Sequence, residues 1–151
     1  MRMIEQFMQV LLSFAAARKA GKHDEAFIQI IDASRVYLEK DITSLVTYTP
    51  TQLLDYFRKN DKDIDAEHSL MCADLILEMA LISDAQKFDT ASVKLKLLSL
   101  HLYINTLLAE IRWRTPDNLK KISLLIDDLK EHALPDEVQK SVELYLQFLM
   151  H

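Results

Sequence analysis

The chain has 151 residues and a formal net charge of −5, and half of its residues are hydrophobic. This length fits one domain with a sizeable core, and so many hydrophobic residues exclude a disordered chain. The acidic excess argues against nucleic-acid binding, which needs a basic surface. One Gly and three Pro leave little room for hairpin turns or Gly-rich loops, so the composition predicts an all-α protein.

The first apolar stretch predicts a helix from Arg2 to Ala20, with apolar residues at spacings of three and four along a broad face. Gly21 suits the residue that follows a helix end, and Asp24 is expected to cap a second helix. Together these helices form a predicted hairpin over 2–40. Polar residues interrupt the first apolar run, so we expect no signal peptide.

The segment 41–65 is richer in charge and Thr, and we interpret it as an insertion with short helices. Thr49 and Gln52 flank Pro50 in a capping-box pattern that starts one of them. A second hairpin is predicted over 66–112, from two long helices that are apolar nearly all round. Helices of this kind, the fourth and fifth of the chain, are typical of the centre of a domain.

Two prolines, Pro116 and Pro135, then open a C-terminal helical pair over 116–150. The chain 1–151 is therefore expected to fold as a single all-α domain of six to seven helices. No apolar run reaches the ~18–20 residues that span a bilayer. We expect a cytoplasmic protein that does not contact membranes.

A short pattern occurs twice, in Gly21-Lys22-His23-Asp24-Glu25-Ala26 and in Gln86-Lys87-Phe88-Asp89-Thr90-Ala91. Lys, Asp and Ala match at a constant offset of 65 residues. Each copy lies between two long apolar-periodic stretches. This arrangement predicts two similar helical hairpins, as in a duplicated or repeat-like α fold.

The first copy resembles a tetratricopeptide repeat, because Gly21, Ala26, Ile30 and Ala33 stand at the places of the turn glycine and of the conserved small and apolar residues. The second copy matches less well, since Gln86 replaces the turn glycine. The small residue usual in the first helix is missing from both copies, where Phe14 and Met79 stand instead.

The whole layout also resembles an uncharacterised bacterial family of tetratricopeptide-like proteins, on the opening Met3-Ile4-Glu5-Gln6, the turn at Gly21 and the middle insertion. The resemblance implies tetratricopeptide-like hairpins in a compact bundle. The likeness to the repeat also implies a helical scaffold of a kind that often binds proteins. Since no coherent catalytic constellation occurs in the sequence, we expect a non-enzymatic protein-interaction or scaffold role, with no cofactor.

In such repeats one face of each hairpin's first helix binds the partner. Carried over by position, that face comprises Met8, Leu11, Ala15, Arg18 and Lys19 in the first copy and Ala73, Ile76, Ala80, Ser83 and Asp84 in the second. An open surface this apolar would be an aggregation liability. We expect the C-terminal helices to cover it; the alternatives are a second subunit of a homodimer or an amphipathic partner.

Arg112, Trp113 and Arg114 form a basic-aromatic cluster that could bind an acidic patch of a partner. The favoured interpretation is structural. Arginine at a helix C-terminus complements the helix dipole, and the tryptophan can plug a junction between helices.

Two histidines each share a helix face with another polar residue, and each pair has a structural and a functional interpretation. His101 and Asn105 share a face of the fifth helix. They could form a hydrogen-bonded core pair or line a ligand pocket between helices four and five. His68 and Cys72 share a face too, as a capping histidine beside a buried cysteine or as a Cys–His dyad. With one cysteine and no HExxH or Gly-x-Ser-x-Gly motif, we predict no metal site and no enzyme.

Overall fold

The computed structural model describes residues 3–150, which form an all-helical fold and so confirm the predicted class. The elements are α1 (Met3–Lys19), α2 (His23–Tyr37), α3 (Ile42–Leu45), α4 (Pro50–Tyr56), α5 (Ala66–Ala85), α6 (Asp89–Ala109), the 3-10 helix η1 (Ile111–Trp113), α7 (Pro116–Leu129) and α8 (Asp136–Met150). The expected count of six to seven helices is wrong, because the described residues form eight α-helices. The predicted helix start at Arg2 lies outside this range.

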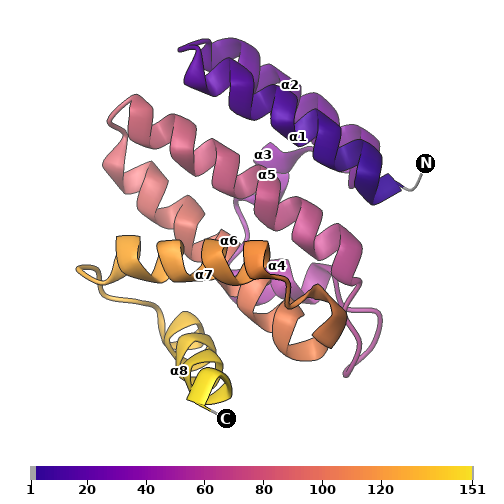
Figure 1. Ribbon diagram of the computed structural model, residues 1–151, viewed down its shortest axis with the longest axis vertical. Coiled ribbons are helices and arrows are strands. Elements are labelled where there is room, and N and C mark those ends of the chain that lie inside the picture. The colour runs from indigo at the N-terminus through magenta and orange to yellow at the C-terminus, as the bar shows by residue number, and fades with distance from the viewer. Residues whose placement is uncertain (1–2, 151) are drawn as a thin grey trace.

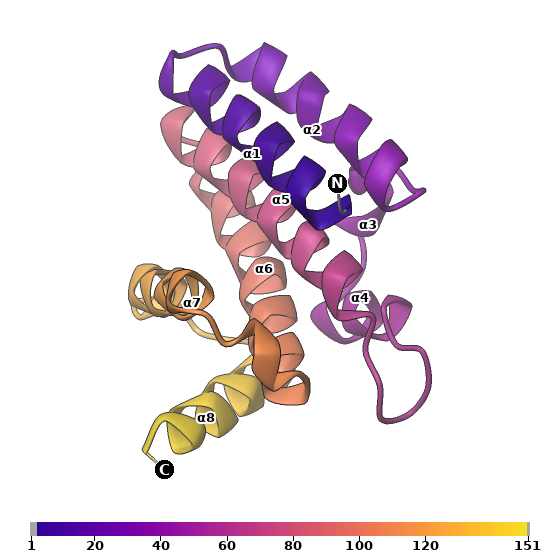
Figure 2. The same ribbon diagram turned by 45° about the vertical axis from the view of Figure 1, so that its right-hand side comes forward.

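The helices form successive layers along the molecule (Figures 1 and 2). The hairpin α1–α2 lies against α5, and the hairpin α5–α6 forms the next layer. α7 and α8 pack on the other side, against α6, and diverge from each other. The short helices α3 and α4 lie beside α2, α5 and α6. In Figure 1, α1 begins at the right side of the upper layer, and α8 ends at the bottom of the molecule.

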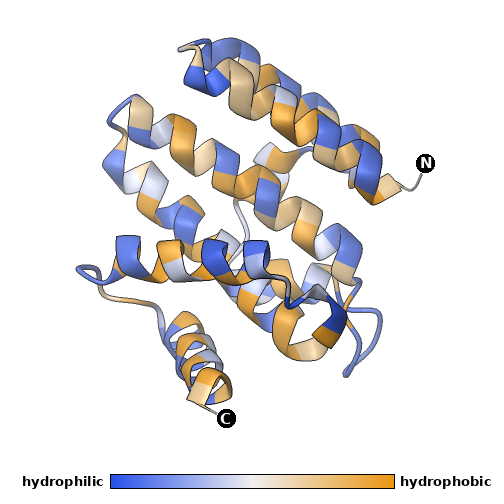
Figure 3. Ribbon diagram, viewed as in Figure 1, coloured by the Kyte–Doolittle hydropathy of each residue, from blue (hydrophilic) through white to orange (hydrophobic). Residues whose placement is uncertain are grey.

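α5 and α6 form the centre of the fold, as their sequences predict. Most residues of both helices are buried, whereas α1 and α2 bury only the side that faces the rest of the molecule. The colouring by hydropathy in Figure 3 shows α5 as an apolar helix within the stack. Among residues 3–150, no helix combines the length and apolar character needed to cross a bilayer.

Several helix boundaries follow the predicted signals. The Thr49 hydroxyl accepts a hydrogen bond from Gln52 N at 3.2 Å, and Gln52 Oε1 accepts one from Thr49 N at 3.0 Å, which confirms the capping box. The predicted cap at Asp24 is wrong. α2 already begins at His23, and Lys22 precedes it without a side-chain cap, so Asp24 lies in the first turn, where a carboxylate suits the helix dipole.

The end of α6 also differs from its prediction, since the helix stops at Ala109 instead of continuing to Arg112. The Arg114 guanidinium folds back and donates hydrogen bonds to the carbonyls of Leu107 at 2.6 Å and Leu108 at 3.1 Å. These carbonyls would otherwise lack partners at a helix end. One turn of 3-10 helix follows in place of further α-helix.

The turns of the two hairpins close by the same hydrogen bonds. Gly21 has φ +78 and Lys87 has φ +63. Lys22 N donates to the Ala17 carbonyl at 2.9 Å, and Phe88 N donates to the Ser83 carbonyl at 2.8 Å. This is the Schellman arrangement, with the left-handed residue directly after the helix. The equivalent residues are thus 66 positions apart (21 and 87), and the offset of 65 suggested by the sequence match is wrong by one.

The corrected offset changes which residues correspond. Phe14 of α1 corresponds to Ala80 of α5, not to Met79, so the second hairpin does carry a small residue there. Two turns earlier, Phe7 corresponds to Ala73. α5 and α6 pack against each other far more extensively than α1 and α2 do. The difference is larger than the greater length of α5 and α6 would produce. At Ala73 the approach is direct, because the Ser99 hydroxyl donates to its carbonyl at 2.9 Å.

Candidate functional site

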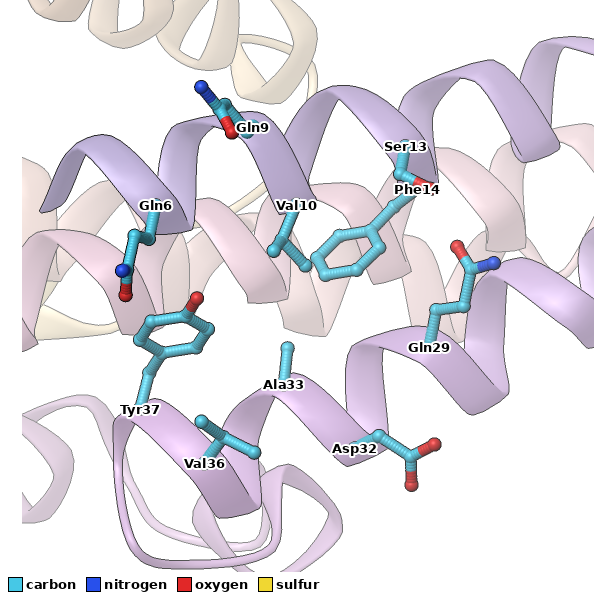
Figure 4. A pocket seen from close by; sticks show the side chains of 10 residues that line it. All are labelled: Gln6, Gln9, Val10, Ser13, Phe14, Gln29, Asp32, Ala33, Val36 and Tyr37. Atoms are coloured by element: carbon cyan, nitrogen blue, oxygen red, sulfur yellow. The ribbon is translucent and has the colours of Figure 1, made fainter. Parts of the chain in front are cut away.

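A solvent-open groove of about 600 Å³ runs between α1 and α2 (Figure 4). Its position follows from the side chains at the helix contact. Phe14 is buried between the two helices, and Phe7 packs edge-on against Tyr37 with ring centroids 5.3 Å apart. The corresponding places in the second hairpin hold alanines. Larger side chains therefore hold α1 and α2 apart where α5 and α6 close together.

The groove has an apolar floor and largely uncharged walls. Its lining comprises Gln6, Gln9, Val10, Ser13 and Phe14 of α1 and Gln29, Asp32, Ala33, Val36 and Tyr37 of α2. In Figure 4, Val10, Phe14 and Ala33 point into the space between the helices. Asp32 is the one charged lining residue, and its carboxylate lies 3.9 Å from Arg35 Nη1. Amides and aliphatic groups therefore dominate its surface.

An exposed stripe runs along α1 beside this groove, and we call it the outer stripe. It comprises Glu5, Met8, Leu12, Ala16 and Lys19, all exposed. With about 100° of rotation per residue, these five side chains fall within about 80° of arc. Leu12 is 69% exposed and Met8 40%. The stripe is therefore an apolar seam with a carboxylate at one end and an ammonium group at the other.

The corresponding stripe of α5 is covered. Its residues Met71, Asp74, Glu78 and Ile82 are buried, and only Ala85, at the end of the helix, is exposed. Arg18 of α1 pairs with Glu78, with Nε and Oε2 2.8 Å apart. Lys121 of α7 donates to Asp74 Oδ1 at 2.9 Å. The same face of a hairpin's first helix is thus covered by helices of this chain in the second hairpin and exposed in the first.

The partner-binding residues expected from the repeat resemblance divide between two faces of α1. Met8 and Lys19 lie on the outer stripe. Leu11 is half-buried, and Arg18 is held by Glu78, so both face α5. Sequence reasoning missed Leu12 and Ala16, because it transferred positions from the repeats. Projection of α1 on a helical wheel separates the two faces.

In the second copy, the expected face is covered within the chain. Ala73, Ile76 and Ala80 are completely buried, whereas Ser83 is half-buried and Asp84, at the end of the helix, is exposed. The covering elements differ from those expected, because α1, α2 and α6 pack on α5, while α7 and α8 pack mainly on α6. The C-terminal pair is therefore not the main cover of this helix.

The basic-aromatic cluster contributes to the fold. Arg114 holds the end of α6 and lies 4.2 Å from the ring centre of Phe148 in α8. Trp113 is half-buried, and its Nε1 is buried without a hydrogen-bond partner among the described residues. Asn118 donates to the Trp113 carbonyl at 2.9 Å. Only Arg112 is fully available to a partner, since it is exposed beside the tryptophan ring.

His101 and Asn105 belong to a hydrogen-bonded core cluster between α6 and α8. Asn105 Nδ2 donates to the His101 carbonyl and to the Ser141 hydroxyl, both at 2.9 Å. Ser141 Oγ lies 3.2 Å from His101 Nδ1. Burial lowers the pKa of His101, which favours the neutral imidazole. Neither His101 nor Asn105 lines any of the five principal pockets of residues 3–150.

His68 and Cys72 do not form a hydrogen bond. His68 Nδ1 lies 2.7 Å from Asp65 Oδ2, and Asp65 also caps α5. Cys72 is completely buried, and burial raises the pKa of its thiol far above the usual range. A thiol in this environment stays protonated and unreactive. The histidine instead borders a second cavity, of about 450 Å³, at the ends of α2 and α4.

A buried ionic network joins three helices, and no sequence pattern predicted it. The Tyr103 hydroxyl of α6 donates to Asp74 of α5. Lys121 of α7 binds the same carboxylate and lies 3.2 Å from Asp117 Oδ2. Burial raises the pKa of Asp74, and the nearby ammonium of Lys121 opposes that shift. These groups fix α7 to the central hairpin and leave no cavity for a substrate.

Within residues 3–150, no three His, Cys, Asp or Glu side chains are grouped so that they could hold a metal ion. The outer face of the first hairpin, formed by the groove and the outer stripe, is open to solvent and carries only three charged residues, Asp32 in the groove and Glu5 and Lys19 at the ends of the stripe. The likeness to tetratricopeptide repeats stays a prediction. No family model, no curated protein and no solved structure matches this chain significantly.

Proposed function

We propose that the protein is a non-enzymatic interaction module, of the scaffold type, which binds another polypeptide through the outer face of hairpin α1–α2. The observation that carries the proposal is the exposed apolar seam of α1, with Leu12 69% exposed, beside an open groove. Apolar surface of this kind on a folded protein typically marks a contact with a partner.

The shape of the groove supports a polypeptide partner over a small molecule. Small-molecule sites are usually concave and bury most of the ligand's surface. This groove is open to solvent along α1 and α2, and its floor is the helix contact itself. A helix laid along it would reach both the apolar floor and the amide groups of Gln9 and Gln29.

The chemistry of the interior supports a non-enzymatic role. The thiol of Cys72 is buried, and the hydroxyl of Ser141 is enclosed between His101 and Asn105. A nucleophile needs access to its substrate, and neither side chain has that access. The alternative of a ligand pocket at His101 and Asn105 is not favoured, because their hydrogen bonds are made within the core.

Site-directed photocrosslinking in living cells tests the proposal. A photoreactive amino acid at Val36, which is 71% exposed on the groove wall, should yield adducts with a discrete polypeptide. The control is the same substitution at Leu144, another exposed position, on α8, with 54% exposure. Absence of an adduct specific to Val36 would refute the proposed binding face.

A further inference from the structure

We infer that the polypeptide bound at this face is a second copy of the same chain, with α1 antiparallel to α1 of the other copy across a two-fold axis near Leu12. The inference rests on the proposed function and names its partner. A symmetric contact needs a surface that is complementary to itself when the chain direction is reversed. The outer stripe has this property.

The stripe is symmetric about Leu12 in both spacing and chemistry. Met8 and Ala16 lie four residues before and after Leu12, and both are apolar. Glu5 and Lys19 lie seven residues before and after it, and their charges are opposite. In an antiparallel pair centred on Leu12, Met8 of one copy faces Ala16 of the other. Glu5 of each copy then faces Lys19 of its partner, which gives two ion pairs.

The two charged residues of the stripe have no interaction partner within the described residues. Neither Glu5 nor Lys19 forms an ion pair or a side-chain hydrogen bond in residues 3–150. The chain carries a net charge of −5, so two copies repel each other overall. The outer face offers little charge repulsion between two copies, because the groove beside the stripe is nearly uncharged and its glutamines both donate and accept.

The second hairpin provides an internal precedent. Glu78 of α5 occupies the place that Leu12 occupies in α1, and it is covered by α1 itself through Arg18. A helix of this chain therefore already packs across the same face of a related hairpin. A second copy that packs on α1 would continue the stack of Figure 2 by one layer.

The size of the face suits a dimer of moderate strength. Two helices of this length, side by side, present a face of about 25 by 20 Å in projection, on the order of 500 Å². A rugged helical face exposes more accessible area than its projection. The total thus approaches the ~800 Å² per partner that is typical of specific complexes.

Solution mass of the purified full-length chain, measured by light scattering over a range of concentrations, tests the inference. The wild type should reach about 35 kDa, twice the chain mass of 17.5 kDa. Leu12→Arg should stay at the mass of one chain, because two cations would meet at the axis. Leu144→Arg, the matched control on α8, should behave like the wild type. Wild-type protein that is monomeric at ~100 µM, well above the micromolar range of many specific complexes, would overturn the inference.

Charge reversal tests the antiparallel register separately. Glu5→Lys and Lys19→Glu should each weaken dimerisation by about tenfold, since each variant creates two repulsive pairs per dimer. The double variant should restore wild-type association. Failure of the double variant to restore it would contradict this register, whereas rescue cannot arise from a merely structural role of either residue.

A cysteine on the axis gives an independent measure of symmetry. With an added oxidant, Leu12→Cys should form a disulfide-linked dimer much faster than Leu144→Cys, because the two-fold axis holds the two introduced thiols together whereas the α8 thiols meet only by collision. The native Cys72 is completely buried and should not interfere. If Val36 crosslinks in cells to a different polypeptide while the wild type is monomeric, the proposed function stands and self-association is refuted. Loss of both signals refutes both.

Discussion

The two hairpins of this protein close with the same turn and yet have opposite surroundings. Gly21 and Lys87 both adopt a left-handed conformation, followed by the same pair of hydrogen bonds. The second hairpin is enclosed by the first hairpin on one side and by α7 and α8 on the other. The first hairpin is covered on one side only. Local turn geometry thus defines the hairpin, and the neighbours define which of its faces can bind.

The comparison extends to the contact between the two helices of each hairpin. Phe7 and Phe14 occupy places where α5 has Ala73 and Ala80. The alanines let α5 and α6 close together, while the phenylalanines fill the space between α1 and α2 and leave a groove beside them. Two differences in side-chain size, seven residues apart on one helix face, thus accompany the difference between the central hairpin and the groove-bearing one.

The largest effect should come from Phe14, which is 1% exposed and separates α1 from α2. Phe14→Ala should reduce the free energy of unfolding by about 3–5 kcal/mol, as is usual when a buried phenylalanine is truncated. Urea denaturation followed by circular dichroism measures the loss. Ile28→Ala, on the exposed side of α2, is the control and should change stability by less than about 0.5 kcal/mol. A loss below about 1 kcal/mol for Phe14→Ala would show that it does not separate the helices.

The next largest loss of stability should come from removing the ion pair through which α7 covers α5 of the second hairpin. Lys121→Met leaves the buried carboxylate of Asp74 without its ammonium partner and should cost about 2–3 kcal/mol. This is less than for a fully buried pair, because the Lys121 side chain is 20% exposed. Lys130→Met removes a surface pair with Asp127 and should cost less than about 0.5 kcal/mol. Equal melting temperatures for the two variants would contradict this account of α7.

Substitution of the left-handed residue should change the stability in opposite directions in the two turns. Gly21→Ala should destabilise by about 1 kcal/mol, because a β-carbon disfavours this conformation. No neighbouring atom lies within 4 Å of the position of the added carbon, so the cost is conformational alone. Lys87→Gly should stabilise by up to about 1 kcal/mol for the same reason. Changes of the same sign, measured by thermal unfolding, would refute the structural equivalence of the turns.

The smallest effect is expected in the dependence of stability on pH. Burial lowers the pKa of His101 below its ordinary 6.5; nearby Glu137 and Asp55 oppose this shift, and Arg58 adds to it. Such a group binds fewer protons in the folded than in the unfolded chain. Its stabilising contribution is therefore complete above about pH 6.5 and is lost as the pH falls through the folded-state value. His101→Gln should reduce the slope of melting temperature against pH in this range.

The matched control is Arg35→Gln, at the corresponding place in the first hairpin, where the side chain is exposed. It should leave the slope unchanged. If His101→Gln has the wild-type slope, burial of the histidine does not contribute to the acid sensitivity of the fold.

Much of the fold could be predicted from local signals, because those signals act over a few residues. The capping box at Thr49 and the apolar character of α5 and α6 led to the correct helices. α3 falls in the segment predicted to hold short helices, but its position was not predicted, since a single turn capped by Asp41 has no periodicity to detect. The cap at Asp24 was misplaced, because the turn after Gly21 already sets the start of α2 through backbone hydrogen bonds.

The candidate site was only partly predictable, because it depends on which helix faces remain uncovered. Met8 and Lys19 lie on the exposed outer stripe of α1, whereas Arg18 and Leu11 point toward α5. Pairing of Arg18 with Glu78, 60 residues away, depends on the packing of whole layers, which no local pattern encodes. The sequence match at an offset of 65 also predicted the wrong correspondence between the hairpins. The turn hydrogen bonds place the equivalent residues, Gly21 and Lys87, 66 positions apart.

Hydrogen exchange along the chain, compared at one concentration between wild type and Leu12→Arg, tests the central claim most directly. The claim is that the outer face of the first hairpin is the bound face of the molecule. We predict that the substitution accelerates exchange within α1 and α2, which lose their cover, and leaves the amides of α5 and α6 unchanged. Equal exchange in α1 and α2 of the two proteins would contradict the claim.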